Sequence, residues 1–247
     1  MSTTNTVLVV GSTGGIGREV VAAASKSGLH PRALARDAAR AHRILGDDVD
    51  IVEGELTDPS TLAEAVRDVD AVVFTHGSGG AYEAVDYGAV ANVLTALGDR
   101  RPRIVLMTTI GVTHDSGGYR DLMNWKRRSE RLVRASGADY TIVRPSWFDR
   151  VDRGDDRLVL QQGDSGNGGV GREQLAETIV RSLLSEEAVG KTFELFATAG
   201  PAATSWDALF APLDTDTDLD GAHDRDTLPL DQEPERVRAD LGRLARS

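Results

Sequence analysis

Short apolar runs rich in β-branched residues alternate along this chain with longer stretches in which apolar residues recur at helical spacing. The first run, Val7–Val10, leads into a cluster of glycines, and a helical pattern begins inside that cluster at Gly17. Runs that are apolar throughout are typical of strands buried on both faces of a parallel sheet, which need helical crossovers between them. The pattern therefore predicts an α/β fold with helices on both faces of the sheet.

The apolar runs predict six to seven strands in a mostly parallel sheet. Each run is short and is followed by a stretch with helical spacing or by turn-forming residues. Helical crossovers between successive strands are characteristic of the Rossmann-type doubly wound architecture. The predicted strands are Val7–Val10, Pro31–Ala35, Asp50–Val52, Ala71–Phe74, Ile104–Met107, Tyr140–Val143 and Thr192–Phe196.

Stretches with helical spacing fill the intervals between these runs. One begins at Asp58, where an acidic cap stands before Pro59, a common helix-start signature. The apolar residues that follow, Leu62, Ala65 and Val66, then share one face, so a helix is expected there. The other predicted helices are Gly17–Ser27, Asp37–Leu45, Asp86–Leu97, Tyr119–Ser136 and Arg172–Leu184.

The composition and the hydrophobic pattern of the chain change after Gly200. The stretch PLDTDTDLDGAHDRDTLPLDQEP is acidic and almost without periodicity. Short helices are expected only around Trp206–Phe210 and Pro234–Leu244. We expect residues 1–200 to form the main domain with its loops. Residues 201–247 then form a small acidic C-terminal extension that packs on the same domain or is partly mobile.

One part of this extension has the beginning of a calcium-loop pattern. Asp216–Gly221 reads D-x-D-x-D-G, but the twelfth position of such a loop needs a bidentate glutamate and is Thr227 here. Repeated like charges also favour an extended, solvated segment. We therefore expect Asp214–Asp226 to be a mobile surface loop, and we expect no metal site.

Composition and charge narrow the choice of partners. The 247 residues carry a net charge of −11, which disfavours nucleic acids and anionic membranes as partners. No apolar run is long enough to cross a bilayer, and the first residues, MSTTNT, lack the parts of a secretory signal. The sequence has no cysteine, which excludes disulfides and thiol chemistry. The expectation is a cytoplasmic protein that acts on a small molecule.

The glycines after the first strand have the spacing G-x-x-G-x-x-G and open a helix. In that place Gly11 permits a tight turn, Gly14 lets the backbone approach a pyrophosphate, and Gly17 lets helix and strand pack closely. Exposed N–H groups and the helix dipole then favour phosphate. The sequence therefore predicts a dinucleotide site built from Gly11, Ser12, Thr13, Gly14, Gly15, Ile16 and Gly17.

The end of the second predicted strand, RALARD, indicates which dinucleotide binds. A carboxylate at this place binds the ribose 2′-hydroxyl of NAD, but Ala35 and Arg36 stand there. A planar guanidinium suits a 2′-phosphate, and Arg40 lies one turn further on. We therefore expect NADP as the cofactor. NAD stays open because Asp37 follows directly.

Six segments occur in the order in which a known family has them. They are VLVVGSTGGIG, RALARD, VEGELTDPSTLAEAVRDVDAVVFTHG, RIVLMTTIGV, WKRRSERLVRASGADYTIVRP and REQLAETIVRSLL. Over about residues 6–200 the chain resembles the atypical short-chain dehydrogenase/reductases of the NmrA-like, NAD(P)H-binding group. The glycine loop is shared by the whole superfamily, whereas Trp125–Pro145 is much more specific to this group.

The resemblance implies roles for residues outside the glycine loop. Lys126 matches the lysine that binds the nicotinamide ribose. Thr108 and Thr109 stand where the family places a serine or threonine beside the nicotinamide, and with Lys126 they are the implied catalytic residues. Further cofactor contacts along the adenosine and near the nicotinamide are implied for Glu55, Leu56, Gly77, Pro145 and Ser146.

One position departs from the superfamily's catalytic pair, Tyr-x-x-x-Lys. Leu122 stands four residues before Lys126, and Tyr119 is seven residues away, nearly two helical turns. Because the tyrosine of that pair transfers the substrate proton, ordinary alcohol–ketone chemistry is in doubt. Other candidate acids, each of which also fits a packing or surface role, are Tyr82, Tyr87, His76 and His114.

Two functions fit this pattern. The first is NADP-dependent transfer of hydride between the nicotinamide and a small conjugated or aromatic acceptor, such as a quinone or a flavin, which needs no strong proton donor at the reacting atom. The second is a non-catalytic NADP(H)-binding sensor that acts through a partner. We expect a monomer or a homodimer, because one side of the helix around Lys126 faces either the sheet or a second subunit. That side carries Leu122, Trp125, Ser129, Leu132 and Val133.

Overall fold

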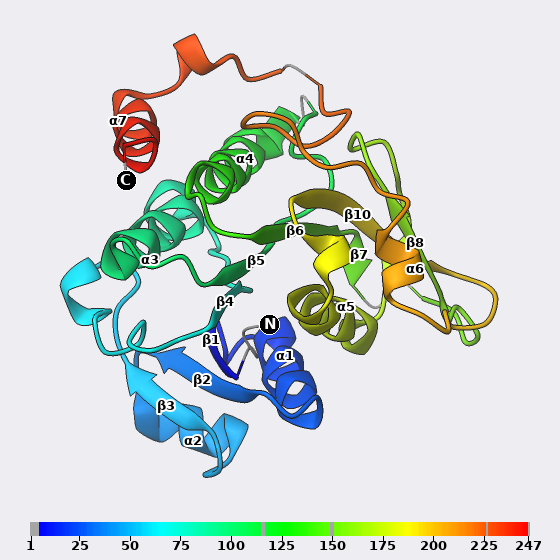
Figure 1. Cartoon of the computed structure of the whole chain (residues 1–247), viewed down its shortest axis with the longest axis horizontal. Coiled ribbons are helices and arrows are strands. Elements are labelled where there is room, and N and C mark those ends of the chain that lie inside the picture. The colour runs from blue at the N-terminus through cyan, green and yellow to red at the C-terminus, as the bar shows by residue number, and fades with distance from the viewer. Residues whose placement is uncertain (1–4, 115–116, 149–150, 226, 247) are drawn as a thin grey trace.

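The computed structural model describes residues 5–114, 117–148, 151–225 and 227–246. One twisted sheet passes through the middle of the molecule, and helices lie on both of its sides (Figure 1). The strand order is β3-β2-β1-β4-β5-β6-β10-β9-β7, with β8 paired to β10. The strands are β1 (Thr6–Val10), β2 (His30–Ala35), β3 (Asp50–Glu53), β4 (Ala71–Phe74), β5 (Arg103–Met107), β6 (Tyr140–Pro145), β7 (Trp147–Phe148), β8 (Arg157–Gln161), β9 (Gly169–Val170) and β10 (Lys191–Thr198).

Neighbouring strands are parallel throughout the series β3-β2-β1-β4-β5-β6-β10. The strand order reverses between β1 and β4, so the loops that leave these two strands diverge to opposite faces. In open parallel sheets this is the place where a crevice opens at the carboxyl ends of the strands. The fold thus confirms the predicted Rossmann-type architecture and positions the glycine loop at that crevice.

The helices form two layers because successive strand residues point to opposite faces of the sheet. Val7 and Val9 pack in a core with α1 and α5. Leu8 and Val10 pack in a second core on the other face, beneath α3, α4 and α7. The helices are α1 (Gly15–Lys26), α2 (Ala38–Leu45), α3 (Gly88–Leu97), α4 (Arg120–Ala135), α5 (Arg172–Leu184), α6 (Asp207–Phe210) and α7 (Glu235–Leu244).

The helix predicted after Asp58 does not form, so that prediction is wrong. The cap itself is present, since the Asp58 carboxylate accepts from the Ser60 amide, but only a single 3₁₀ turn, Pro59–Thr61, follows. In an α-helix the Asp58 carbonyl would accept from the Leu62 amide. Instead it accepts from the amide and the hydroxyl of Thr61, at 3.1 and 2.8 Å. The apolar residues of the segment are nevertheless buried, as expected.

The sheet has more strands than the six or seven predicted. β8 pairs antiparallel with the second half of β10, and the two-residue strands β7 and β9 extend the same edge. The side of α4 on which a subunit contact was considered lies inside the protein. Leu132 and Val133 are fully buried, and the partly buried Trp125 packs against the same core.

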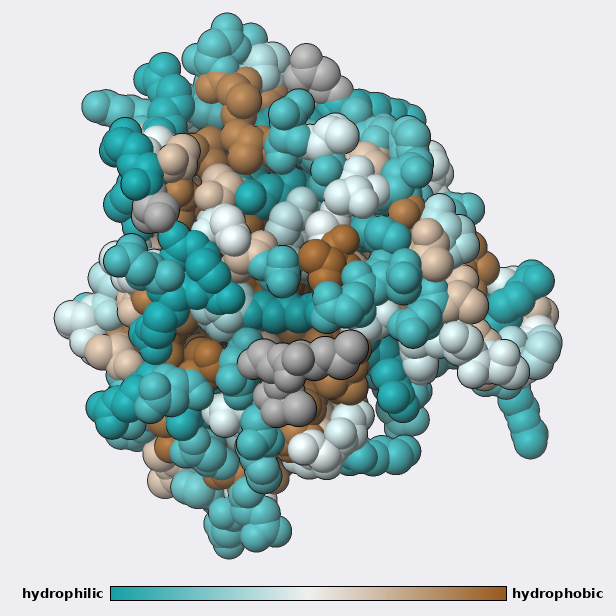
Figure 2. Space-filling model, in the orientation of Figure 1, coloured by the Kyte–Doolittle hydropathy of each residue, from teal (hydrophilic) through white to brown (hydrophobic). Residues whose placement is uncertain are grey.

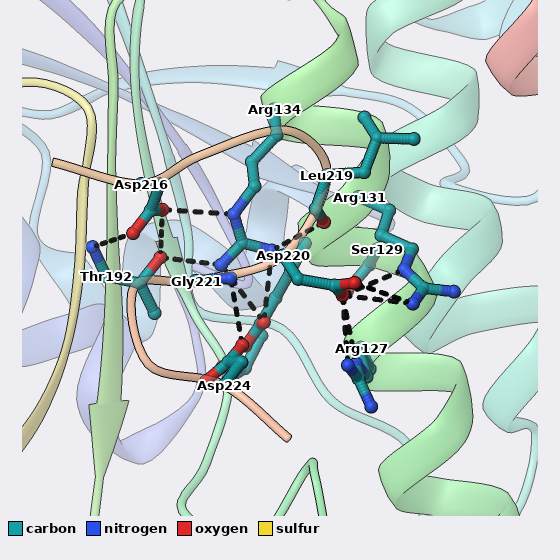
Figure 3. A network of polar contacts seen from close by, with 12 residues as sticks. Arg127, Ser129, Arg131, Arg134, Thr192, Asp216, Leu219, Asp220, Gly221 and Asp224 are labelled. Atoms are coloured by element: carbon teal, nitrogen blue, oxygen red, sulfur yellow. Dashed lines mark hydrogen bonds and ion pairs between the residues drawn. The ribbon is translucent and has the colours of Figure 1, made fainter. Parts of the chain in front are cut away.

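The acidic C-terminal segment lies along α4 and is not a mobile, solvated loop, so that expectation is wrong (Figures 1 and 3). Asp216 lies 3.0 Å from Arg134, and Asp220 lies 3.0 Å from Arg131. The Asp216 side chain is 0% exposed. The arginines recur at helical spacing, so they form a basic strip on α4 that the segment neutralises. The last residue of the expected loop, Asp226, is outside the described residues.

Beneath this strip lies a second, fully buried group of charges. Arg144 on β6 contacts Glu130 of α4 and Asp224 of the C-terminal segment, each at 2.7 Å. Burial alone would raise the pKa of Glu130, but the charges of Arg144 and Arg134 and the hydrogen bonds from Arg144 and Thr108 together outweigh it and lower the pKa to about 2. The charge of Glu194 on β10 is less well compensated. Glu194 lies 3.7 Å from Arg144, and its carboxylate oxygens have no hydrogen-bond partner among the described residues.

The surface on the viewed side is mostly hydrophilic, with hydrophobic atoms in several separate patches (Figure 2). Among the described residues, no helix is both long and apolar enough to cross a membrane.

Burial raises the pKa of Glu194 to about 7, and this makes folding stability depend on pH. Between its ordinary value and pH 7 the folded protein binds more protons than the unfolded chain, so stability falls as pH rises through that range. Glu194→Gln removes this slope. We expect the variant to exceed the parent by about 2–3 kcal/mol at pH 8 and by little at pH 5. Urea denaturation at both pH values measures this. Glu187→Gln, at an exposed position, is the control, and a parallel gain at both pH values would contradict the assignment.

Asp216→Asn removes the closer of the two acids beside Arg134 and leaves it only Glu130, at 3.4 Å, among the described residues. Such losses cost about 3–5 kcal/mol, so we expect a marked fall in the free energy of unfolding. Asp218→Asn, two residues away at an exposed position, is the matched control and should stay within about 0.5 kcal/mol of the parent. Equal stability of the two variants in urea would show that the C-terminal segment contributes little to the fold.

Candidate functional site

The glycine loop between β1 and α1 has no room for side chains at two of its glycines. Gly11 has a φ of +86°, and a Cβ atom there would lie 2.7 Å from the backbone nitrogen of His76 on the neighbouring chain segment. A Cβ atom on Gly17 would collide with the carbonyl oxygen of Gly11. The Gly14 amide donates to the same oxygen at 3.0 Å. The loop is therefore a tight backbone turn that presents the start of α1 to the crevice.

A cleft of about 430 Å³ begins at this loop and runs across the ends of β1, β2 and β4. The buried Ser12 hydroxyl donates to the carbonyl of Leu34 at 3.0 Å and fixes the loop against β2. Several residues predicted for cofactor binding line the cleft together. They are Gly11, Thr13, Gly14, Arg36, Glu55, Leu56 and Gly77.

A second recess, of about 310 Å³, continues from the cleft beyond the end of β2. Arg36 and Arg40 line it and are exposed. The Asp37 carboxylate accepts from the Arg40 amide at 2.8 Å and so caps α2. Because this carboxylate acts as a helix cap, the guanidinium of Arg36 is the main group in the recess that could bind a ligand. That arrangement suits a 2′-phosphate.

The two residues at the adenine end differ in how they are held. The Glu55 carboxylate folds back to the Thr57 amide at 3.4 Å, while the Leu56 carbonyl accepts from Asn92 at 2.7 Å. Both remain in the cleft wall. Their contacts with a bound adenine stay a prediction.

Lys126 is held by an acid that the sequence analysis did not single out. Its Nζ lies 3.0 Å from Oδ1 of Asp86, whose side chain is 1% exposed. The Ser78 amide and hydroxyl donate to the other oxygen of Asp86. Asp86 was expected at the start of a helix, but it lies inside a π-helical segment, Tyr82–Tyr87, that precedes α3. The feature of the sequence that could have indicated this role is a carboxylate that stands alone beside the apolar pattern of α3.

His76 belongs to the same cluster and is neutral at physiological pH. Burial, together with the nearby charge of Lys126, lowers the pKa of His76 to about 4. Its Nε2 lies 3.2 Å from the Asp86 carbonyl. Because a carbonyl only accepts, the neutral ring donates through Nε2 and its Nδ1 can only accept, so His76 is not a proton donor in the cleft.

The other candidate acids are engaged away from Lys126. The Tyr87 hydroxyl donates to Asp240 of α7 at 2.8 Å, and burial raises the pKa of Tyr87. His114 contacts the carbonyl of Asp164 at 2.6 Å. Tyr119, just before α4, is 66% exposed. Tyr82 is partly buried, and its contacts do not indicate a role as an acid.

The predicted residues at the ends of β5 and β6 are close to the network under α4. The Thr108 hydroxyl donates to Glu130 at 2.7 Å. The Ser146 hydroxyl donates to the Gly168 carbonyl, and the Pro145 carbonyl accepts from Ile110. Thr109 is partly exposed beside Thr108. Contacts of these residues with a nicotinamide stay predictions.

Comparison with known proteins agrees with this geometry. Residues 11–186 match the model of a family described as NAD(P)H-binding. A sanguinarine reductase from Eschscholzia californica is 26% identical over 238 residues, covering 74% of this chain and 86% of that protein. An NAD(P)H azoreductase from Xenophilus azovorans is 33% identical over 142 residues, covering 58% of this chain and 48% of that protein.

A solved structure with the same architecture is the anaerobillin reductase ChuY from Escherichia coli O157:H7. Its TM-score is 0.67 at 21% identity, and the match covers 81% of this chain and 100% of that one. At this identity the likeness shows a shared fold.

Arg36→Ala tests the recess beyond β2. Because a hydrogen bond to a charged group contributes about 1.5–3 kcal/mol, we expect the affinity for NADP⁺ to fall at least tenfold and that for NAD⁺ to stay unchanged. Titration calorimetry measures both. Arg43→Ala removes an exposed charge from the same helix and is the control. Parent protein that binds the two nucleotides equally would contradict the assignment.

Proposed function

The chain belongs to the NAD(P)H-binding family, and from this premise we propose that it is an NADP-dependent oxidoreductase. In this proposal it transfers hydride between the nicotinamide and a small conjugated or aromatic acceptor, of the quinone or flavin type. The cofactor lies in the cleft at the glycine loop, with its 2′-phosphate in the recess of Arg36. The cytoplasmic location expected from the sequence is part of the proposal.

The observation that carries the choice of acceptor is the cluster around Lys126. Leu122 stands in place of the tyrosine that transfers protons in related enzymes, and Lys126 is paired with Asp86. His76, in the same cluster, is neutral. An isolated ketone needs a proton at its oxygen as hydride arrives at carbon. A conjugated acceptor spreads the incoming charge over its π-system, so this cluster suits it better.

Lys126 then acts by position. Its ion pair with Asp86 fixes the ammonium group beside the second turn of α4, where it would donate to the hydroxyls of the nicotinamide ribose. Thr109 and Ser146 would orient the nicotinamide ring. Trp147 and Phe148 follow β6 and are 56% and 37% exposed, so a planar acceptor has aromatic surface to stack on.

The names of the two sequence relatives, a sanguinarine reductase and an NAD(P)H azoreductase, support a reductase. The missing tyrosine also fits the alternative, a sensor that binds NADP(H) and acts through a partner. Monomer or homodimer stays a prediction for either function.

Oxidation of NADPH in the presence of menadione, riboflavin or cyclohexanone tests the proposal. We expect turnover with the quinone or the flavin, faster with NADPH than with NADH, and none with the isolated ketone. Lys126→Met should raise the KM for NADPH, since it removes a ribose contact, whereas Lys26→Met at the exposed end of α1 should not. Tight NADPH binding without turnover of any acceptor would favour the sensor, and reduction of cyclohexanone would contradict the choice of acceptor.

A further inference from the structure

A basic side chain from α5 lies directly on the first turn of α1. A Cβ atom on Gly15 would collide with Nη1 of Arg172, so the guanidinium packs on the backbone at the point where α1 begins. The guanidinium carbon also lies 5.6 Å from the ring centre of Phe148 in β7. Arg172 therefore stands between the glycine loop and the segment expected beside the nicotinamide.

The backbone of Arg172 is held firmly enough for this position to be specific. Arg172 is the first residue of α5, and the Gly171 amide before it donates to Gln174 at 2.9 Å. Gln174 in turn donates to the Asp155 carbonyl at 2.8 Å. Behind this start, α5 and α1 pack side by side in one core, as Figure 1 also shows. The start of α5 is thus fixed relative to the start of α1.

The charge balance at the glycine loop makes this guanidinium significant. The loop itself has no basic residue between Gly11 and Gly17, and a helix N-terminus supplies only about half a positive charge. Arg36 and Arg40 lie at the far end, in the recess beyond β2. A pyrophosphate carries two negative charges, so a cation closer to the loop than Arg36 would strengthen its binding there.

We propose that Arg172 binds the pyrophosphate of the dinucleotide, as a cation that closes over the glycine loop from α5. Its guanidinium would donate to the phosphate oxygens close to the N–H groups at the start of α1. This role is the same for NADP and NAD, because both carry the pyrophosphate. It concerns binding of the cofactor and is independent of hydride transfer.

Arg172→Gln and three nucleotides test the proposal by titration calorimetry. We expect the affinities for NADP⁺ and NAD⁺ to fall by the same factor, about ten- to hundredfold. Adenosine 2′-phosphate, which has the 2′-phosphate but no pyrophosphate, should bind as it does to the parent. Arg36→Ala should give the complementary result, with NADP⁺ and adenosine 2′-phosphate weakened and NAD⁺ unchanged.

Two further variants separate this role from a structural one. Arg181→Ala removes a charge from the other end of α5 and should leave all three affinities at the parent values. Gly15→Ala places a methyl group where the guanidinium packs. It should weaken NAD⁺ binding more in the parent than in Arg172→Gln, because the guanidinium is then already absent. Parent-like NAD⁺ affinity in Arg172→Gln, or an equal loss of adenosine 2′-phosphate binding, would overturn the proposal.

Discussion

The burial of the Arg144 guanidinium beneath α4 is the constraint on which both the site and the C-terminal segment depend. A buried cation that loses its partners costs several kcal/mol, so Glu130 and Asp224 must stay beside it. Glu130 lies one turn after Lys126 on the same helix. The contact that compensates Arg144 therefore also fixes the helix that carries Lys126. Asp224 ties the C-terminal segment to the same point.

The parts of the fold that were predictable from sequence are those that local pattern controls. The central strands β1, β4 and β5 are almost entirely apolar runs, and the crossover helices repeat at helical spacing, so the parallel sheet and its two layers follow from the chain itself. The helix prediction after Asp58 was wrong because the Thr61 side chain competes for the carbonyl that a helix needs. The prediction that the acidic segment is a solvated loop was wrong for a different reason. Its like charges predict an extended, solvated chain only when no opposite charge is near, and the arginines of α4 are distant in sequence.

The same division holds within the site. The glycine loop and Arg36 could be assigned to one cleft from sequence because a turn and a strand end fix them locally, and their contacts with a cofactor stay predictions. Asp86 and Arg172 were not assigned, because each acts across the fold, on Lys126 from a π-helical segment and on Gly15 from α5. Thr108 shows the converse. Its place at the end of β5 followed from sequence, but the direction of its hydroxyl depends on Glu130, which enters from α4.

Local compensation also explains how an acidic protein can hold an anionic ligand. At physiological salt, exposed charges are screened beyond about 8 Å, so acids remote from the cleft weigh little on a phosphate bound there. The acids that lie close to cations are already used: Asp216 and Asp220 neutralise the arginines of α4, and Asp37 caps α2. The field at the cleft is then set by the start of α1 and by the guanidinium groups at its edge. The net charge of −11 thus weakens binding less than its size suggests, and we expect the position of single arginines to decide which dinucleotide is held.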